Sequence, residues 1–355
     1  MKSNISGSEL EQVVNQFGYQ ANNYQAVPLG NGLINHTFFI EDDRKNMVLQ
    51  RLNHNVFPQP QQVIENAELI SQHLCSQKEN NNYPLTPIWQ LNANNGDIAV
   101  QQGEYTWRAL HYQPNCYTIE AISTTTQASQ AATAFAQFTA ALSNFDAKKL
   151  NTIIPDFHNI HFRLNQLNQA IVSDQADRLT TCQPWIKYCL AQQGFIDQVG
   201  KLTAKLPLHV THNDTKINNL LFCSKLQRPL AVIDLDTCMP GYLMHDFGDM
   251  VRTCCSNLAE DSTDLKQMEI RLDIFHALLN AYTDTFKDQI TPLERKSLLI
   301  GAQLLPLMIG MRFLTDYLNG DNYFHINYPE HNLDRAANQF TLHKLLNSSI
   351  SKLNI

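Results

Sequence analysis

The chain has 355 residues, of which 43% are hydrophobic and 17% charged, and its formal net charge is -7. This composition excludes an intrinsically disordered chain, which would combine low hydrophobicity with high net charge. With 26 basic against 33 acidic residues and no basic run, the chain lacks a surface that could neutralise nucleic-acid phosphates. The length is sufficient for two packed lobes. We therefore expect a globular protein that does not bind nucleic acid.

The N-terminal residues and the cysteines bear on where the protein works. Residues 1–20 contain no unbroken apolar segment of the kind that a secretory signal requires, and their pattern predicts an amphipathic helix from about Ser8. The eight cysteines show no C-x-x-C spacing, so we expect reduced thiols and neither a zinc site nor a disulfide framework. These observations favour a cytoplasmic protein.

Residues 1–112 are predicted to form a nucleotide-binding α+β lobe. Short strand candidates, broken by Gly and Asn, lie at residues 37–40, 47–52, 98–101 and 106–112. One strong helix is expected over residues 61–77, where apolar side chains recur at helical spacing after two prolines. The pattern therefore predicts a small lobe built on an antiparallel sheet.

Residues 113–355 are predicted to form a larger, mainly helical lobe that carries the catalytic loop. Its clearest helix covers residues 128–145, and short β-like runs flank the polar segment HNDTKINN at residues 212–219. The most apolar stretch, residues 297–314, contains Gln303, Pro306 and Arg312, and an arginine is costly in hydrocarbon. We expect this stretch to be a buried helix and not a membrane span.

The polar segment at residues 212–219 has the residues that phosphoryl transfer requires. That reaction needs a carboxylate to orient and deprotonate the acceptor hydroxyl, and oxygen ligands for the metal that neutralises the phosphates. Asp214 precedes Asn219 by the spacing of the protein-kinase catalytic loop H-R-D-L-x-x-x-N. We predict that Asp214 is the general base, that Lys216 contacts the transferring phosphate, and that His212 orients the loop without reacting.

Magnesium ligands are predicted at two places in the chain. Asn219 ends the polar segment, and Asp234 follows an apolar run as the aspartate of D-F-G does in protein kinases. Asp236 points to the same side as Asp234 on an extended segment, so it either joins the metal site or hydrogen-bonds to it. ATP and Mg²⁺ are therefore the expected cofactors.

The phosphate-binding loop is expected in the first lobe. Gly30 and Gly32 precede the first strand pair together with Asn35, and glycines allow the backbone to approach phosphates closely. A plain Asn-Gly hairpin turn is the alternative interpretation of this segment.

The strand at residues 47–52 lacks the lysine with which kinases bind phosphates. Arg51 is the best substitute, and Gln50 is the alternative. A cation here usually pairs with an acid on the following helix, for which Glu65 and Glu68 are the candidates. Both glutamates could instead face solvent.

With HNDTKINN followed by VIDLD, the chain resembles the aminoglycoside phosphotransferase and choline kinase superfamily, which shares the two-lobed protein-kinase-like fold. It is similar to N-acetylhexosamine 1-kinases in NGLINHTFFI, VLQRLNHNVF, VTHNDTKINNLLF, VIDLDTCMPGYLMHDFGDMVR and RFLTDYLNGDNYF. The resemblance implies transfer of the γ-phosphoryl group of ATP to the anomeric hydroxyl of N-acetylglucosamine or N-acetylgalactosamine. The sugar contacts that we expect are Asp214, His36, Arg312 and Tyr323.

Two alternative functions remain at this level. The acceptor could be another small alcohol, such as choline, homoserine, an aminoglycoside or another sugar. The chain could also be a nucleotide-binding module without catalysis, which the missing lysine favours. Outside these residues, Asp246 and Asp249 are expected to cap and brace helices rather than to touch substrate.

Overall fold

The computed structural model describes residues 5–19, 24–30, 34–42 and 45–351, and the chain divides into two compact units. The first unit comprises Met1–Thr118, Ala141–Ile154 and Leu220–Pro240, and the second comprises Ile119–Ala140, Pro155–Asn219 and Gly241–Ile355. The segments of the two units therefore alternate along the chain. The first change of unit falls after Thr118.

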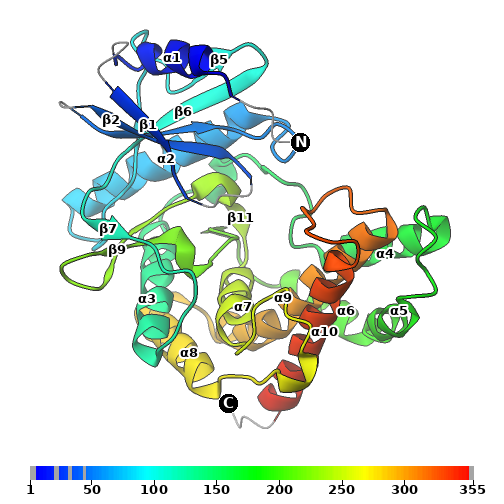
Figure 1. The fold of residues 1–355 in the computed structure, drawn as a ribbon. Helices are drawn as coiled ribbons and strands as arrows, with labels where there is room; N and C mark the ends of the chain where they lie inside the picture. The colour runs from blue at the N-terminus through cyan, green and yellow to red at the C-terminus, as the bar shows by residue number, and fades with distance from the viewer. Residues whose placement is uncertain (1–4, 20–23, 31–33, 43–44, 352–355) are drawn as a thin grey trace. The chain divides into compact units, whose positions relative to one another are not determined.

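The first unit is built on an antiparallel sheet. Its strands are β1 (Tyr24–Pro28), β2 (His36–Asp42), β3 (Met47–Arg51), β4 (Gln90–Leu91), β5 (Val100–Gln102) and β6 (Tyr105–His111) (Figure 1). The strand order is β1-β2-β3-β6-β4, with β5 also paired to β6. Every pairing is antiparallel, which confirms the predicted small antiparallel-sheet lobe.

Helices α1 (Gly7–Gln16) and α2 (Pro60–Glu79) lie on opposite sides of this sheet (Figure 1). Ser6 caps α1 by accepting a hydrogen bond from the backbone of Glu9, and proline begins α2 where no intrahelical donor is needed. Val13 and Val14 of α1 are fully buried in one cluster with Trp107 of β6. The face of the sheet that carries Trp107 therefore packs against α1.

A smaller sheet in the same unit leads into the predicted metal aspartate. Its strands, in the order β10-β9-β7, are β7 (Cys116–Tyr117), β9 (Leu220–Cys223) and β10 (Pro229–Val232). The chain leaves β10 and makes a short 3₁₀ turn, η3 (Leu235–Thr237), for which Asp234 adopts a left-handed conformation with φ 60°. This conformation is uncommon for a residue other than glycine.

The second unit is mainly helical, as predicted. Its helices are α3 (Thr125–Ala141), α4 (Ile160–Ser173), α5 (Gln183–Leu190), α6 (Gln193–Thr203), α7 (Leu243–Cys254), α8 (Leu272–Phe286), α9 (Pro292–Leu318) and α10 (His331–Ile350). The short strand β8 (His209–Thr211) precedes the polar segment, η2 (Ile217–Asn219) forms its last turn, and β11 (Met239–Gly241) precedes α7.

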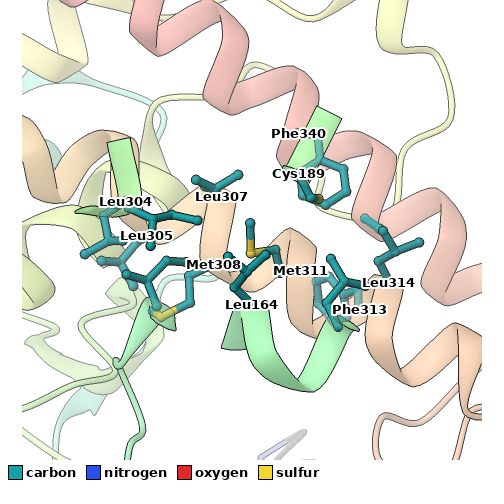
Figure 2. Close-up of a cluster of buried hydrophobic side chains, with 14 of the residues drawn as sticks. Leu164, Cys189, Leu304, Leu305, Leu307, Met308, Met311, Phe313, Leu314 and Phe340 are labelled. Carbon is teal, nitrogen blue, oxygen red and sulfur yellow. The ribbon is translucent and has the colours of Figure 1, made fainter. Parts of the chain in front are cut away.

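Helix α9 forms the centre of the helical unit. Thr291 and Glu294 make a reciprocal capping box at its start. Figure 2 shows its side chains from Leu304 to Leu314 gathered with Leu164 of α4 and Phe340 of α10. By length and composition α9 could cross a membrane, but 78% of its most apolar window is buried inside the protein. It is therefore a core helix, as the polar interruptions predict.

Helices α7 and α9 approach each other through two glycines. A Cβ atom added to Gly248 would lie 2.3 Å from the carbonyl oxygen of Gly301, and one added to Gly301 would lie 2.0 Å from the carbonyl oxygen of Met244. Both distances are shorter than atoms tolerate, so this close contact requires glycine on each helix. The contact matters for the site because α7 carries Asp246.

Candidate active site

The loop after β8 is held by a side chain of α7. Both carboxylate oxygens of Asp246 accept backbone hydrogen bonds, from His212 at 2.9 Å and from Asn213 at 2.7 Å. The backbone oxygen of Asp246 also accepts a 2.6 Å hydrogen bond from the Thr215 hydroxyl. Asn213 has φ 65°, so the chain turns sharply just before Asp214. Asp246 therefore determines the conformation of the predicted catalytic loop.

Asp214, Lys216 and Asn219 come together at this loop. Lys216 Nζ lies 3.0 Å from Asp214 Oδ1, and Asn219 Nδ2 donates to Asp214 Oδ2 at 3.1 Å. Burial alone would raise the pKa of Asp214, but Lys216 and His212 outweigh it, so the pKa is lowered. Asp214 is consequently ionised at neutral pH, as a general base must be.

His212 has the surroundings of an orienting residue. Its side chain is completely buried, and its ring lies edge-on to Phe135 and Phe138 of α3, with centroids 5.4 and 5.8 Å away. Its Nδ1 accepts a 3.3 Å hydrogen bond from the backbone N–H of Asp214. These contacts hold the ring of His212 in one orientation beside the loop.

The side chain of Asn219 is oriented by Asp214. Its amide nitrogen donates to both the backbone oxygen and the carboxylate of Asp214, which leaves Oδ1 without a hydrogen-bond donor among the described residues. An amide oxygen and a carboxylate such as that of Asp234 are hard ligands of the kind that magnesium prefers. Within the part of the chain that the structure describes, no three His, Cys, Asp or Glu side chains gather into a metal-binding group.

An ionic network continues from α7 behind the loop. Arg252 pairs with Asp249 at 2.8 Å and with Glu260 at 2.5 Å, and Arg335 of α10 pairs with Glu260 at 2.6 Å. Burial raises the pKa of Glu260, but the two arginines outweigh it and lower the pKa to about 2. Asp249 thus braces its own helix, as expected. Asp246 has the additional loop contacts described above, which a capping role does not include.

Arg312 of α9 lies within a group of aromatic rings. Its guanidinium carbon is 5.3 Å from the ring centroid of Phe157, 5.7 Å from that of Tyr323 and 5.4 Å from that of Phe324. Its Nη2 also lies 3.5 Å from the Tyr323 hydroxyl. The structure therefore brings together two of the predicted sugar contacts of the helical unit, Arg312 and Tyr323. We call this set the Arg312 cluster.

Two neutral histidines adjoin the Arg312 cluster. The rings of His158 and His245 are 4.8 Å apart, and both side chains have buried ring nitrogens without a hydrogen-bond partner of standard geometry. Burial, His245 and Arg312 lower the pKa of His158 well below its ordinary value, although the nearby Asn213 backbone opposes the shift. His158 consequently lies uncharged between the catalytic loop and Arg312. No spacing pattern in the sequence points to either histidine.

In the first unit, Asp236 is engaged on both carboxylate oxygens. Arg108 of β6 donates to Oδ1, and Asn35 donates to Oδ2 at 2.7 Å. Arg108 also donates to Gln50 Oε1 from Nε at 3.0 Å and from Nη2 at 2.8 Å. Of the two roles left open for Asp236, these contacts favour hydrogen bonding beside the predicted metal site over direct ligation.

Arg51 faces away from Asp236. Because side chains alternate along β3, Arg51 lies on the opposite face from Gln50. Its guanidinium lies 3.6 Å from Glu9 of α1 and 4.2 Å from the ring centroid of Tyr105. The expected pairing of Arg51 with the following helix is thus replaced by a contact with the preceding one.

Helix α2 has other contacts than the expected ion pair. Glu65 accepts a 3.4 Å hydrogen bond from Asn151, and Glu68 accepts from Gln72 at 2.7 Å and from Gln90 at 3.1 Å. The buried Asn66 donates to the backbone oxygens of Asn151 and Cys238. Asn66, which the sequence did not single out, therefore ties α2 to the end of η3.

The remaining predicted residues of the first unit have limited descriptions. Gly30 has φ 72°, a conformation that favours glycine, and nothing lies within 4 Å of an added Cβ atom. Gly32 lies outside the described residues. His36 begins β2 opposite Arg51 of β3.

The chain matches one protein family and several solved structures. A family model described as "Phosphotransferase enzyme family" matches residues 25–283. An aminoglycoside phosphotransferase from Alicyclobacillus acidocaldarius has a similar structure, with a TM-score of 0.65, 13% identity, and coverage of 99% of this chain and 97% of that chain.

Two further solved structures are similar over nearly their whole length. A microcompartment-associated aminopropanol kinase gives a TM-score of 0.60 at 16% identity and covers 98% of each chain. Choline kinase from Cryptosporidium parvum gives 0.60 at 11% identity, covering 98% of this chain and 96% of that chain. At these low identities, the TM-scores show that the chain shares the fold of these proteins. Since the family model spans most of the sequence, the chain belongs to the phosphotransferase enzyme family.

Proposed function

We propose that this protein is an ATP-dependent kinase that phosphorylates the anomeric hydroxyl of an N-acetylhexosamine, N-acetylglucosamine or N-acetylgalactosamine, to give the sugar 1-phosphate. The observation that carries the phosphoryl transfer is the ionised Asp214, held between Lys216 and Asn219 on a loop that Asp246 fixes. The choice of acceptor rests on the sequence resemblance and on the Arg312 cluster.

The proposed reaction uses few groups of the protein. Asp214 accepts the proton of the anomeric hydroxyl as that oxygen forms a bond to the γ-phosphorus of ATP. The bond between the γ-phosphorus and the β,γ-bridging oxygen breaks, and ADP leaves. Lys216 is close enough to Asp214 to contact the transferred phosphoryl group beside the base. The remainder of the rate acceleration comes from holding the two substrates in line.

Asn219 and Asp234 each carry an oxygen donor of the kind that magnesium binds. When bound, the metal would neutralise charge that develops on the phosphate oxygens. The oriented Oδ1 of Asn219 supports this assignment, because its amide nitrogen is already committed to Asp214. Asp236, committed to Arg108 and Asn35, would support the site from beside it.

The charge of the Arg312 cluster supports a neutral acceptor. Choline and aminoglycosides are cations, and binding them near Arg312 would place like charges together at a considerable cost. An N-acetylhexosamine has no charge, offers hydroxyl and amide groups to Arg312, His158 and Tyr323, and presents an apolar ring face to aromatic side chains. This argument favours the sugar over the cationic acceptors of the same fold.

The test is a product assay with one acceptor at a time. Purified protein is incubated with ATP, Mg²⁺ and either sugar, and the product is examined by NMR for phosphorus coupling to the anomeric proton. Parallel reactions contain choline, homoserine, an aminoglycoside or glucose. We expect sugar 1-phosphate only with the N-acetylhexosamines. Turnover of one of the other alcohols, with none of the two sugars, would refute the acceptor while leaving the kinase assignment intact.

A further inference from the structure

We propose that Arg108 is the positioning residue that replaces the absent phosphate-site lysine, acting through Asp236 rather than on the nucleotide directly. The inference rests on the nucleotide-binding part of the proposed function and is independent of the acceptor. The position on β3 where kinases have a lysine carries an uncharged side chain here. A kinase needs a cation on this sheet, yet β3 offers only Gln50 on the face toward Asp236.

Strand pairing supplies the cation from the neighbouring strand. Gln50 of β3 and Arg108 of β6 are direct partners in the antiparallel register, so their side chains lie on the same face. Gln50 accepts two hydrogen bonds from the guanidinium and donates its own amide to Thr37 at 3.2 Å. The side chain in the lysine position therefore orients an arginine from the next strand.

Three parts of the nucleotide-binding unit meet at Asp236. Arg108 brings β6, Asn35 brings the end of the glycine-containing segment, and Asp236 itself belongs to the η3 turn that follows Asp234. Asn35 is fixed in turn, because its Oδ1 accepts a 3.0 Å hydrogen bond from the backbone of Asn53. A disturbance of Arg108 would thus reach both the phosphate loop and the metal aspartate.

The charges explain why the site needs this arginine. The side chains of Arg108 and Asp236 are each only 2% exposed, and a buried carboxylate without a counter-charge is strongly unfavourable. Two carboxylates near a triphosphate would also repel it. By pairing with Asp236, Arg108 neutralises one of them, two residues after the proposed metal ligand Asp234. A magnesium nucleotide is therefore the ligand whose affinity depends on Arg108.

Isothermal titration of ADP, with and without Mg²⁺, tests the inference without any acceptor. We compare wild type with Arg108→Gln, with Arg108→Lys, and with Arg51→Gln, which removes the rival buried cation on the other face of the same sheet. We expect Arg108→Gln to weaken binding of Mg·ADP by about tenfold or more while ADP without magnesium changes by less than about twofold, the behaviour of a residue that supports a metal ligand. Arg108→Lys retains the charge and is expected to lose less.

Each other outcome has a definite meaning. Equal losses with and without magnesium would show that Arg108 contacts the phosphates directly, and a larger loss in Arg51→Gln would return the role to Arg51; either result overturns the inference. If Arg108→Gln does not fold, Asp236→Asn gives the same comparison, and an unchanged magnesium effect in it also overturns the inference. Absence of Mg·ADP binding in wild type would instead refute the proposed kinase, and this inference with it.

Discussion

Asp246 and Asn213 are joined by a 2.7 Å hydrogen bond from a backbone N–H to a buried carboxylate, at the residue immediately before Asp214. Asp214, the proposed base, therefore lies on a loop held by a helix that begins about thirty residues later in the chain. Burial raises the pKa of Asp246 to about 7, because the two backbone donors only partly offset the loss of solvation. The loop depends on a carboxylate that is expensive to bury, which makes it sensitive to this one side chain.

Replacing Asp246 is expected to impair turnover. In Asp246→Ala both backbone donors lose their acceptor, the loop relaxes, and kcat falls by about 10²-fold, the cost of misplacing a reacting group by roughly 1 Å. Steady-state kinetics with the best acceptor measures this. Asp284→Asn, at an exposed position of α8, is the matched control and should retain wild-type rates. Equal rates in both variants would show that turnover does not depend on the hydrogen bonds between Asp246 and the loop.

Removing the charge of Asp214 is expected to abolish most of the chemistry. Asp214→Asn keeps the shape but accepts no proton, so kcat should fall by about 10²-fold or more while the KM for ATP stays near its wild-type value. Single-turnover measurements separate the chemical step from product release. A wild-type rate in this variant would remove Asp214 from the mechanism.

Stability should decline in acid through Glu260. Its ordinary pKa of 4.5 applies to the unfolded chain, whereas in the folded protein Arg252 and Arg335 overcome the burial effect and lower the pKa to about 2. Between these values the unfolded chain binds a proton that the folded protein does not, so the free energy of unfolding decreases as pH falls from about 5 to 2. Urea denaturation at a series of pH values measures the slope. Glu260→Gln should be less stable at pH 7 and show a shallower decline; an identical slope would contradict the assignment.

The contact between α7 and α9 should not tolerate a methyl group. Gly248→Ala places Cβ against the Gly301 carbonyl, and the resulting displacement should cost about 1–3 kcal/mol of unfolding free energy or more. Gly194→Ala, in a helix where nothing lies within 4 Å of the added atom, is the control and should be neutral or stabilising by about 0.4–1 kcal/mol. Thermal and urea unfolding compare the two. A similar change in unfolding free energy for both variants would mean that α7 and α9 accommodate the added methyl group at little cost.

His158 offers a test of the acceptor site. His158→Phe removes ring nitrogens beside Arg312 and should raise the KM for the sugar by about tenfold, the effect of one lost hydrogen bond in a buried site. Because its pKa lies well below 6.5, the effect should be the same from pH 6 to pH 8. The KM for ATP serves as the internal control. An unchanged sugar KM would place the acceptor elsewhere.

Local patterns were sufficient to predict the two kinds of lobe. Alternating strands broken by Gly and Asn, a helical repeat after two prolines, and an apolar stretch interrupted by Pro306 each report on their own segment. The grouping of the predicted catalytic residues could also be predicted, because Asp214, Lys216 and Asn219 are close in the sequence, and they are in contact in the structure.

Contacts between distant segments escaped prediction. Arg108 and Gln50 are 58 positions apart and are joined by the strand register, whereas Arg108 and Asp236 are 128 apart and meet where the η3 turn packs against the sheet. The face on which Arg51 lies depends on where α1 packs, and residues 47–52 contain no signal for that. Asp246 looked like a helix cap because it occurs near a helix start; its loop partners are 33 and 34 positions earlier.

The pairing of Gln50 with Arg108 also has a meaning for how such sequences are sorted. A scan for a lysine on β3 would discard this chain as catalytically inert. Adjacent antiparallel strands present their facing side chains about 5 Å apart, a distance that an arginine spans easily. A cation on the neighbouring strand can therefore take the place of one on β3. When the lysine of β3 is absent, the other side chains on the same face of the sheet should be examined before a chain is called inactive.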